Sequence, residues 1–163
     1  MAPIDPGLQR LLDDHEVEYE LIHHREDFRA RRTADDSHTP PEEFAKTVVV
    51  HVDGGYAIAV LPATHYLAPA RLARSIGAGQ VRLASESEMQ NLMPGYEIGA
   101  APPFSSLCGV PVYASPLLAR EKHITFNAGT HRDALRMSWA DYERLAKPLV
   151  VHLSHHEDEP APE

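Results

Sequence analysis

The fold is decided by residues 46–61, Lys46-Thr47-Val48-Val49-Val50-His51-Val52-Asp53-Gly54-Gly55-Tyr56-Ala57-Ile58-Ala59-Val60-Leu61. Two runs rich in β-branched residues flank Asp53-Gly54-Gly55, and this spacing predicts two strands joined by a tight hairpin turn. The triplet Val48-Val49-Val50 is apolar without alternation. We therefore expect the first strand to be central in its sheet and covered on both faces.

Further helices and strands are predicted on both sides of this hairpin, without a regular βαβ alternation. Helices are expected at residues 7–14, from 39 for a short stretch, and at 69–76, 85–93 and 138–147. Strands are expected at residues 17–22, 80–83, 110–114, 123–127, 134–137 and 149–153. Because 163 residues suit one domain, the sequence predicts a single α+β domain with a mixed sheet packed against helices.

Local patterns indicate where several of these helices begin and end. Thr39-Pro40-Pro41-Glu42 and Ser85-Glu86-Ser87-Glu88 both have the spacing of a capping box. Ser138 is placed to cap the last helix, and Gly77 is placed to end the helix at 69–76. Residues 24–39 are polar, carry four arginines, and are expected to form a loop or an irregular helix.

The C-terminal residues differ in composition from the rest of the chain. From Ser154 onward the sequence is polar, acidic and proline-containing, with no apolar face. Such a segment cannot bury enough apolar surface to offset the entropy of ordering it. We therefore expect a folded domain at 1–153 and a disordered acidic tail at 154–163.

Charge and cysteine content limit the possible functions. The formal net charge is −9, which argues against a broad nucleic-acid surface but allows a flexible nucleic-acid end to enter a pocket. The single cysteine, Cys108, excludes an internal disulfide. No apolar run reaches the length of a membrane span, and the first residues do not resemble a signal peptide, so we expect a cytoplasmic protein without a membrane partner.

Lys46 is the first candidate for chemistry because it opens an otherwise apolar strand. A lysine ammonium in a pocket at the sheet edge could hold a phosphate or a carbonyl oxygen. The alternative is an ordinary solvated lysine at the end of a strand.

The loop Gly99-Ala100-Ala101-Pro102-Pro103-Phe104 is the second candidate. Small residues leave the backbone N–H groups of 99–101 uncovered, and the two prolines stiffen the loop. A rigid loop with free amides could stabilise the oxyanion formed when an ester is attacked. The alternative is a plain surface loop.

The segment Phe126-Asn127-Ala128-Gly129-Thr130-His131 is the third candidate. Asn127 and Gly129 predict a tight turn after a strand, followed by the polar groups of Thr130 and His131. His131 could orient a water or bind a ribose hydroxyl, or it could be an exposed turn histidine.

Other chemistry has little support in the sequence. Eleven histidines occur, but neither His23-His24 nor the group at 152–156 has the cysteine or carboxylate neighbours usual for zinc. Cys108 has no neighbour that marks it as activated, so a packed thiol is expected. No serine lies in a G-x-S-x-G elbow, and no nucleotide-binding fingerprint is present.

The three candidate segments, taken in this order, resemble the YbaK family, an editing-domain superfamily also found inserted in bacterial prolyl-tRNA synthetases. The resemblance covers roughly residues 5–152. It implies a curled mixed sheet and a trans-acting deacylase for mischarged tRNA, with neither metal nor cofactor. The tRNA 3′ aminoacyl end is then the partner, with a synthetase as a further candidate, and alanine or cysteine on proline tRNA are the implied substrates.

The resemblance also assigns roles to residues of this chain. It implies catalytic roles for Lys46, Gly99, Ala100 and Ala101. It implies substrate binding by residues of the same three segments: Thr47, Pro102, Pro103, Asn127, Gly129, Thr130 and His131. Residues 24–39 depart most from the family, where this region helps to cover the pocket.

Two other classes of function stay open. One is a non-catalytic binding module of the same fold, since fold does not fix function. The other is a hydrolase for a small acyl ester or thioester, which the acidic composition would suit. The presence of Lys46 and of a G-x-x-x-P loop favours the tRNA deacylase.

Overall fold

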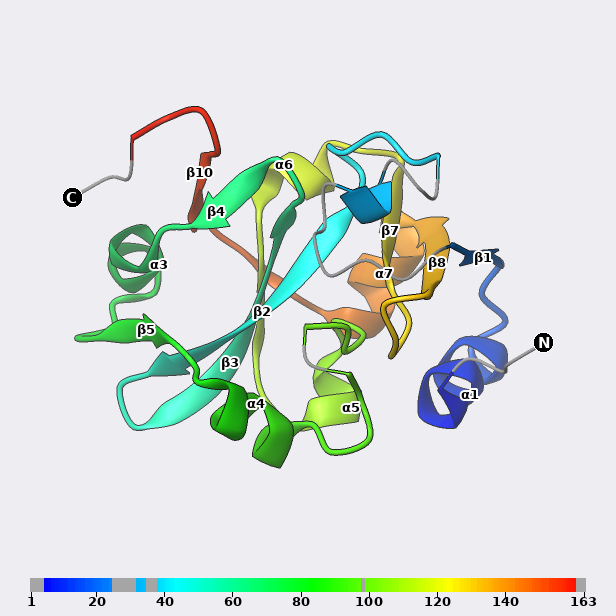
Figure 1. Ribbon diagram of the computed structural model, residues 1–163, viewed down its shortest axis with the longest axis horizontal. Helices are drawn as coiled ribbons and strands as arrows, with labels where there is room; N and C mark the ends of the chain where they lie inside the picture. The colour runs from blue at the N-terminus through cyan, green and yellow to red at the C-terminus, as the bar shows by residue number, and fades with distance from the viewer. Residues whose placement is uncertain (1–4, 25–31, 35–37, 98, 161–163) are drawn as a thin grey trace.

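A five-stranded mixed sheet is built around the predicted hairpin in the computed structural model, which describes residues 5–24, 32–34, 38–97 and 99–160. Its strand order is β5 (Val81–Leu83), β2 (Ala45–Val52), β3 (Gly55–Pro62), β6 (Val112–Ala114) and β9 (Leu149–Val150) (Figure 1). β2 pairs with β3 in antiparallel register, with Val52 opposite Gly55. Asp53 has a φ of 53°, which suits the two-residue turn.

Two smaller sheets complete the β structure. The first has the order β1 (Tyr19–His23), β8 (Asp133–Ser138), β7 (His123–Asn127), and all its pairs are antiparallel. The second pairs β10 (Ser154–His156) with β4 (His65–Leu67). The described strands thus form three sheets rather than one curled sheet, and β4 was not predicted.

The described helices are short. They are α1 (Pro6–Asp14), α3 (Pro69–Ile76), α4 (Glu86–Leu92), α5 (Ser105–Cys108), α6 (Pro116–Ala119) and α7 (Trp139–Ala146). Of these, α1, α3, α4 and α7 begin at or within one residue of the positions that the sequence indicates. The capping box of Ser85 and Glu88 is present, and the Ser138 side chain accepts from the Asp141 N–H. Gly77 ends α3 in the left-handed conformation, so these three predictions are confirmed. α5 and α6 were not predicted. None of the helices in the described residues is long and apolar enough to cross a bilayer.

The prediction of a short helix from Thr39 is wrong. The N–H groups of Glu43 and Phe44 both donate to the Pro40 carbonyl, which makes one turn. The turn stops there because Phe44 is fully buried and the chain enters β2 at Ala45.

The expected disorder from Ser154 onward is also wrong for the residues that the structure describes. Ser154 and His155 are buried in β10. The Arg71 guanidinium donates to the Ser154 carbonyl at 2.8 Å, and the Ala68 N–H donates to the Leu153 carbonyl at 2.8 Å. β4 and α3 therefore supply the partners that the tail lacks within itself. Residues 161–163 lie outside the described part.

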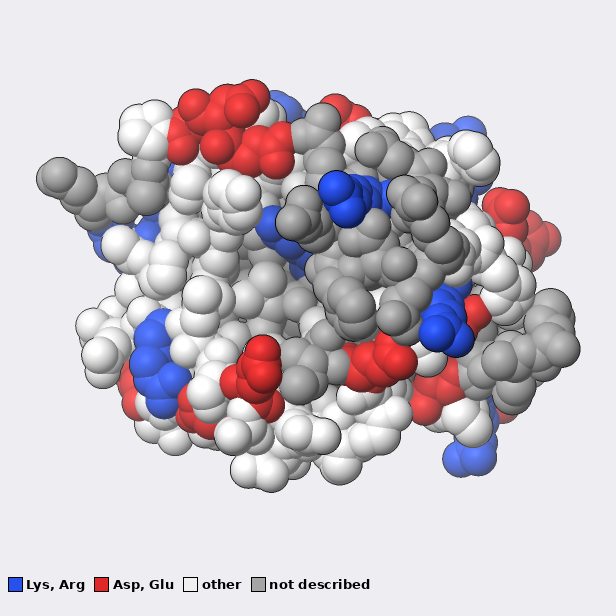
Figure 2. Space-filling view, in the orientation of Figure 1, with Lys and Arg blue, Asp and Glu red and all other residues white. Residues whose placement is uncertain are grey.

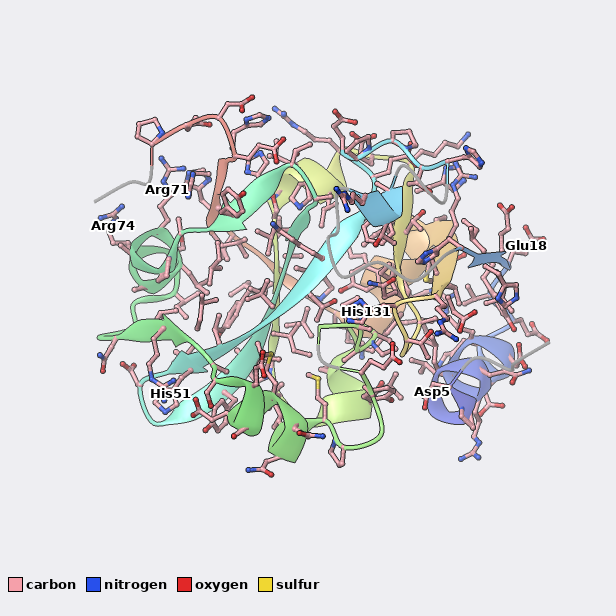
Figure 3. The ribbon with its side chains drawn as sticks, in the orientation of Figure 1. Asp5, Glu18, His51, Arg71, Arg74 and His131 are labelled. Carbon is pink, nitrogen blue, oxygen red and sulfur yellow. The ribbon has the colours of Figure 1, made fainter. Side chains whose placement is uncertain are left out.

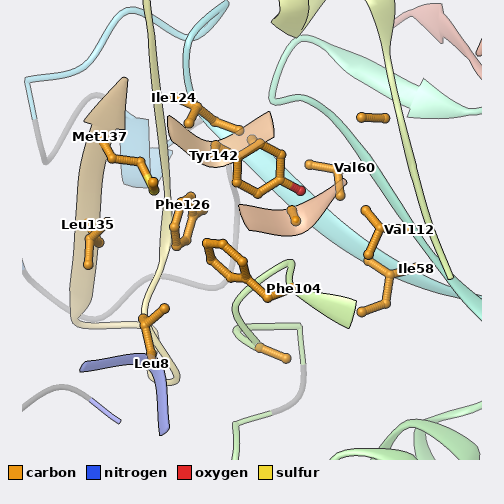
Figure 4. Packing of buried hydrophobic residues seen from close by; sticks show 14 of the residues in the cluster. Leu8, Ile58, Val60, Phe104, Val112, Ile124, Phe126, Leu135, Met137 and Tyr142 are labelled. Carbon is orange, nitrogen blue, oxygen red and sulfur yellow. The ribbon is translucent and has the colours of Figure 1, made fainter. Parts of the chain in front are cut away.

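Apolar residues cover both faces of the central hairpin, as predicted. On one face the rings of Phe104, Phe126 and Tyr142 meet with centroids 5.2–6.2 Å apart (Figure 4). On the other face, Val50 and Leu61 pack with residues of α3 and the chain before β10. The hairpin is therefore a rigid support for side chains placed at its edge.

Candidate functional site

The candidate site lies at a part of β2 that has no neighbouring strand on one side. β5 pairs only with Val50–Val52, and at the other end Phe44 forms a parallel bridge with Thr125 of β7. Between these points no strand in the described residues pairs with β2 on the side away from β3. On this side the Val49 carbonyl accepts a hydrogen bond from the Ala84 N–H. Residues two positions apart in a strand direct their backbone N–H and C=O groups to the same side. The N–H and C=O of Thr47 therefore also face this open edge.

A small pocket adjoins one face of the open edge. Its volume is about 10 Å³, the space of about one water molecule. Thr47 and Val49 of β2 form one wall. Met89 and Gln90 of α4, with Met93 at the helix end, form the opposite wall.

The third wall of the pocket is the loop that follows α4. Tyr96, Glu97, Gly99 and Ala101 line it, so the structure brings the predicted loop next to Thr47. The pocket is mainly apolar, with polar groups from Thr47, Gln90 and Glu97. This combination of an apolar wall with a few polar groups is typical of sites for small groups.

Hydrogen bonds join this loop to the turn at 129–131. The Gly129 N–H donates to the Ala100 carbonyl at 2.8 Å, and the Glu97 N–H donates to the Gly129 carbonyl at 3.0 Å. The His131 N–H donates to Glu97 Oε1 at 2.6 Å. Two segments that are about 30 residues apart in the sequence are thus held together as one unit.

The expectation of three free amides at 99–101 needs one correction. The Ala100 N–H donates to the Glu97 carbonyl at 3.0 Å, and Ala100 is fully buried. In the described part of the chain, the amides of Gly99 and Ala101 have no backbone acceptor. Two donors, not three, are therefore available to an oxyanion.

Pro102 and Pro103 support the loop and do not face the pocket. Both are buried, and the Pro103 carbonyl accepts from the Tyr142 hydroxyl at 2.8 Å. Neither lines the small pocket, and their predicted contact with substrate stays a prediction. The bond to Tyr142 links the loop to α7 at Pro103.

The turn after β7 is built as predicted. Within it the Thr130 hydroxyl is paired, whereas Asn127 Oδ1 is buried with no hydrogen-bond partner among the described residues. Gly129 has a φ of 104°, which glycine adopts without strain. The Thr130 hydroxyl donates to Asp133 Oδ2 at 2.8 Å, so its role is in shaping the turn. Asn127 ends β7, opposite Ala134 of β8.

His131 is buried rather than exposed, with 5% of its surface accessible. It lies beside the loop that carries Gly99 (Figure 3). A Cβ built on Gly99 would be 3.7 Å from its Cε1, so the imidazole packs directly against this glycine. His131 is therefore placed to hold the loop in position.

Lys46 lies on the other face of β2 from Thr47, because successive side chains of a strand alternate. Its Nζ is 4.7 Å from the centre of the Tyr66 ring of β4. Burial lowers the pKa of Lys46, and the negative charge of Glu157 partly opposes this shift. Lys46 and the pocket are thus on opposite sides of one open strand edge, so a ligand lying across that edge can contact both.

Several residues of the site were not found from the sequence. Met89 and Met93 are spaced by one helical turn after the capping box, which could have indicated a pocket wall. Glu97 gives no such signal, because its contacts come from a segment distant in the sequence. Tyr66 and Glu157 were missed because they belong to the β4–β10 region, which was not predicted.

Charged side chains form no continuous basic surface on the face shown in Figure 2, where lysines and arginines are scattered among acidic groups. No group of three histidine, cysteine, aspartate or glutamate side chains in the described residues is arranged to hold a metal ion. The rings of His155 and His156 instead contact Tyr66 and His65.

Comparison with known proteins identifies the family. The model of the aminoacyl-tRNA editing domain matches residues 24–145. The multifunctional Ser/Thr-tRNA deacylase ProXp-y of Escherichia coli K12 is 31% identical over 147 residues, which cover 87% of each chain, and the protein of strain O157:H7 gives the same values.

Solved structures share the fold at low sequence identity. Hypothetical protein APE2540 has a TM-score of 0.81 at 20% identity, covering 91% of this chain and 99% of that one. A protein proposed to be a trans-editing enzyme for prolyl tRNA synthetase has a TM-score of 0.78 at 20% identity, covering 94% and 99%. These matches confirm the resemblance drawn from the three segments and the single α+β domain. The chain belongs to the aminoacyl-tRNA editing domain family, the YbaK-like deacylases.

Proposed function

We propose that this chain hydrolyses, in trans, the ester between a small amino acid and the 3′ end of a mischarged tRNA, with serine as the preferred amino acid. The observation that carries the proposal is the pocket of about 10 Å³ beside Thr47. A space this narrow favours a small side chain, and that of serine carries a hydroxyl as well. The polar groups of Gln90 and Glu97 in the wall are suited to that hydroxyl.

Other small amino acids fit this pocket less well. Alanine matches the volume but leaves the polar groups of the wall without a partner, which costs binding energy. Threonine adds a methyl group, for which a methionine must move, and one such group typically changes the rate by about 10- to 200-fold. The E. coli relative is named for both serine and threonine. Alanine and cysteine on proline tRNA, implied by the sequence resemblance, are thus secondary candidates.

The reaction needs little beyond positioning and charge stabilisation. The ester carbonyl is placed at the open edge of β2, where the amides of Gly99 and Ala101 stabilise the developing oxyanion. Lys46, on the other face of the edge, holds the phosphate of the terminal nucleotide as a point charge. A water attacks the carbonyl carbon, and the ester bond from that carbon to the ribose oxygen breaks. The neighbouring ribose hydroxyl relays the proton of the water to the departing ribose oxygen, which leaves the free amino acid and an uncharged tRNA end.

Only the end of the tRNA need enter the site. The net charge of −9 and the scattered basic residues in Figure 2 favour contact with a single-stranded end over contact with a long duplex. Docking on a synthetase could supply the remaining tRNA contacts.

A deacylation panel tests the proposal. The purified chain is incubated with tRNAs charged with serine, threonine, alanine or cysteine, including proline tRNA, and the initial rates are compared with and without EDTA. We expect seryl-tRNA to be hydrolysed fastest, with no effect of EDTA. Turnover of cysteinyl-tRNA above seryl-tRNA would contradict the pocket assignment. If no charged tRNA is hydrolysed, the deacylase assignment fails. Cleavage of simple esters would then indicate a small-ester hydrolase, and no cleavage would indicate a binding module.

A further inference from the structure

The ring of Tyr66 is unusually accessible for a residue so near the candidate site. Tyr66 is 55% exposed, although it lies in a strand that pairs with β10. Among the described residues, the other large hydrophobic side chains that are exposed are Leu83 and Leu149, which lie on other strands. Single exposed apolar side chains are common, so the informative feature is that this ring lies against the ammonium group of Lys46 and keeps an amphipathic aromatic surface open to solvent.

We propose that Tyr66 is the stacking platform for the terminal base of the tRNA, next to the phosphate held by Lys46. The inference rests on the proposed function and adds a base-binding subsite to it. Proteins bind single-stranded nucleic acid by combining a cationic group for the backbone with aromatic rings for the bases. Lys46 Nζ and the Tyr66 ring, 4.7 Å apart, are such a pair.

The contact between Lys46 and Tyr66 is well suited to exchange. A cation over an exposed aromatic face is a weak interaction, whereas an ammonium contact to a phosphate is charge-assisted and stronger. When the RNA end arrives, Lys46 turns from the ring to the phosphate. The base then stacks on the part of the Tyr66 ring that is exposed to solvent.

The surroundings hold the ring in place. His155 of β10 lies opposite Tyr66 in the strand pair, and its ring centroid is 5.9 Å from that of Tyr66. His155 is itself buried. His155 of β10 therefore supports the Tyr66 ring on one side, and the base approaches the ring from solvent.

No base-specific contact is needed at this position. All tRNAs end in the same CCA sequence, so a deacylase gains nothing from reading the edge of the last base. Stacking is tolerant of sequence because every base has a π face. Stacking on Tyr66 can therefore bind the terminal base without a hydrogen bond to its edge.

The first test measures base stacking directly. A short RNA ending in CCA, with 2-aminopurine in place of the terminal adenine, is titrated with the protein while its fluorescence is followed. We expect quenching on binding to wild type and an affinity about 5- to 100-fold lower for Tyr66→Ala. Tyr66→Phe should bind within about twofold of wild type, and Tyr66→Trp at least as tightly. Leu149→Ala, which removes an equally exposed side chain from β9, is the matched control and should bind as wild type does.

The second test uses deacylation. Stacking stabilises the bound substrate and the transition state equally. Tyr66→Ala should therefore raise KM and leave kcat unchanged. Unaltered binding and KM for a folded Tyr66→Ala variant would overturn the proposal. Loss of binding in Tyr66→Phe as large as in Tyr66→Ala would also overturn it, because the hydroxyl would then be the ligand. If wild type binds the RNA through Tyr66 but hydrolyses no charged tRNA, the proposed function fails while the base subsite stands.

Discussion

Replacing Gly99 with alanine tests whether the loop of residues 99–103 stabilises the oxyanion. Gly99 has a φ of +82°, a conformation that costs an L-residue about 1–2 kcal/mol. The added Cβ would be 3.7 Å from His131 Cε1, an ordinary contact, so steric overlap adds little. For a domain of this size, such a loss lowers Tm by about 2–8 °C, which leaves the protein folded at 25 °C.

The effect on catalysis should be larger than this loss of stability. The methyl group and the relaxing backbone would turn the Gly99 amide away from the carbonyl oxygen, and losing one such donor costs about 10²–10³ in kcat. Melting curves and single-turnover deacylation of seryl-tRNA on the same sample measure both effects. Gly77→Ala is the matched control, because Gly77 has a φ of +71° with open space around its Cβ position at the end of α3. It should lose similar stability and keep the wild-type rate. A folded Gly99→Ala variant that deacylates at the wild-type rate would show that this loop does not bind the oxyanion.

Three further changes have definite expected outcomes. Lys46→Ala should keep its melting temperature within a few degrees of wild type and lose at least tenfold in kcat/KM. The reason is the loss of the charge-assisted contact between Lys46 and the phosphate, which is worth about 1.5–3 kcal/mol. Near-wild-type turnover would refute the role of Lys46. Removal of residues 154–163 should lower Tm by several degrees and weaken deacylation, because β10 supports β4 and the Tyr66 ring. A disordered tail, as expected from composition, would have no such effect, so an unchanged melting curve would refute this prediction. Thr125→Val should raise Tm by about 2–4 °C in calorimetry. The fully buried Thr125 hydroxyl has no partner among the described residues, so its removal should raise the free energy of unfolding by about 1 kcal/mol. A lower Tm would mean that the hydroxyl is paired.

Elements with strong local signals could be predicted from the sequence. The hairpin at 46–61 combines β-branched runs with a turn that few residue types can form, and the cap of Ser85 with Glu88 needs no distant partner. Both are determined within a few residues, so tertiary contacts do not override them.

The short polar strands could not be predicted in this way. β4 and β10 have three residues each, and their stability comes from pairing with each other and from Arg71. The turn at Pro40 was misread for a related reason. Its capping pattern is real, but burial of Phe44 ends the turn before a helix forms.

The candidate site was predicted in its parts but not in its arrangement. Lys46 and Thr47 are neighbours in the sequence, yet the alternation of β2 sends them to opposite faces. The link from Glu97 to His131 helps to hold the loop that carries the amides, and it spans 34 positions of the sequence. Such long-range hydrogen bonds leave no local pattern.

The bonds between the loop and the turn at 129–131 have a consequence for how substrate choice can change. The amide donors sit on a segment tied to β7 and α7, whereas the pocket is narrowed by Met89 and Met93 at the end of α4. Methionine is flexible and tolerates replacement, so the width of the pocket can be altered from α4 alone. The wall of the pocket formed by α4 can therefore change without the loop that carries the amides, so a relative could acquire a larger amino acid as its substrate by one change in α4 while its ester chemistry stays intact.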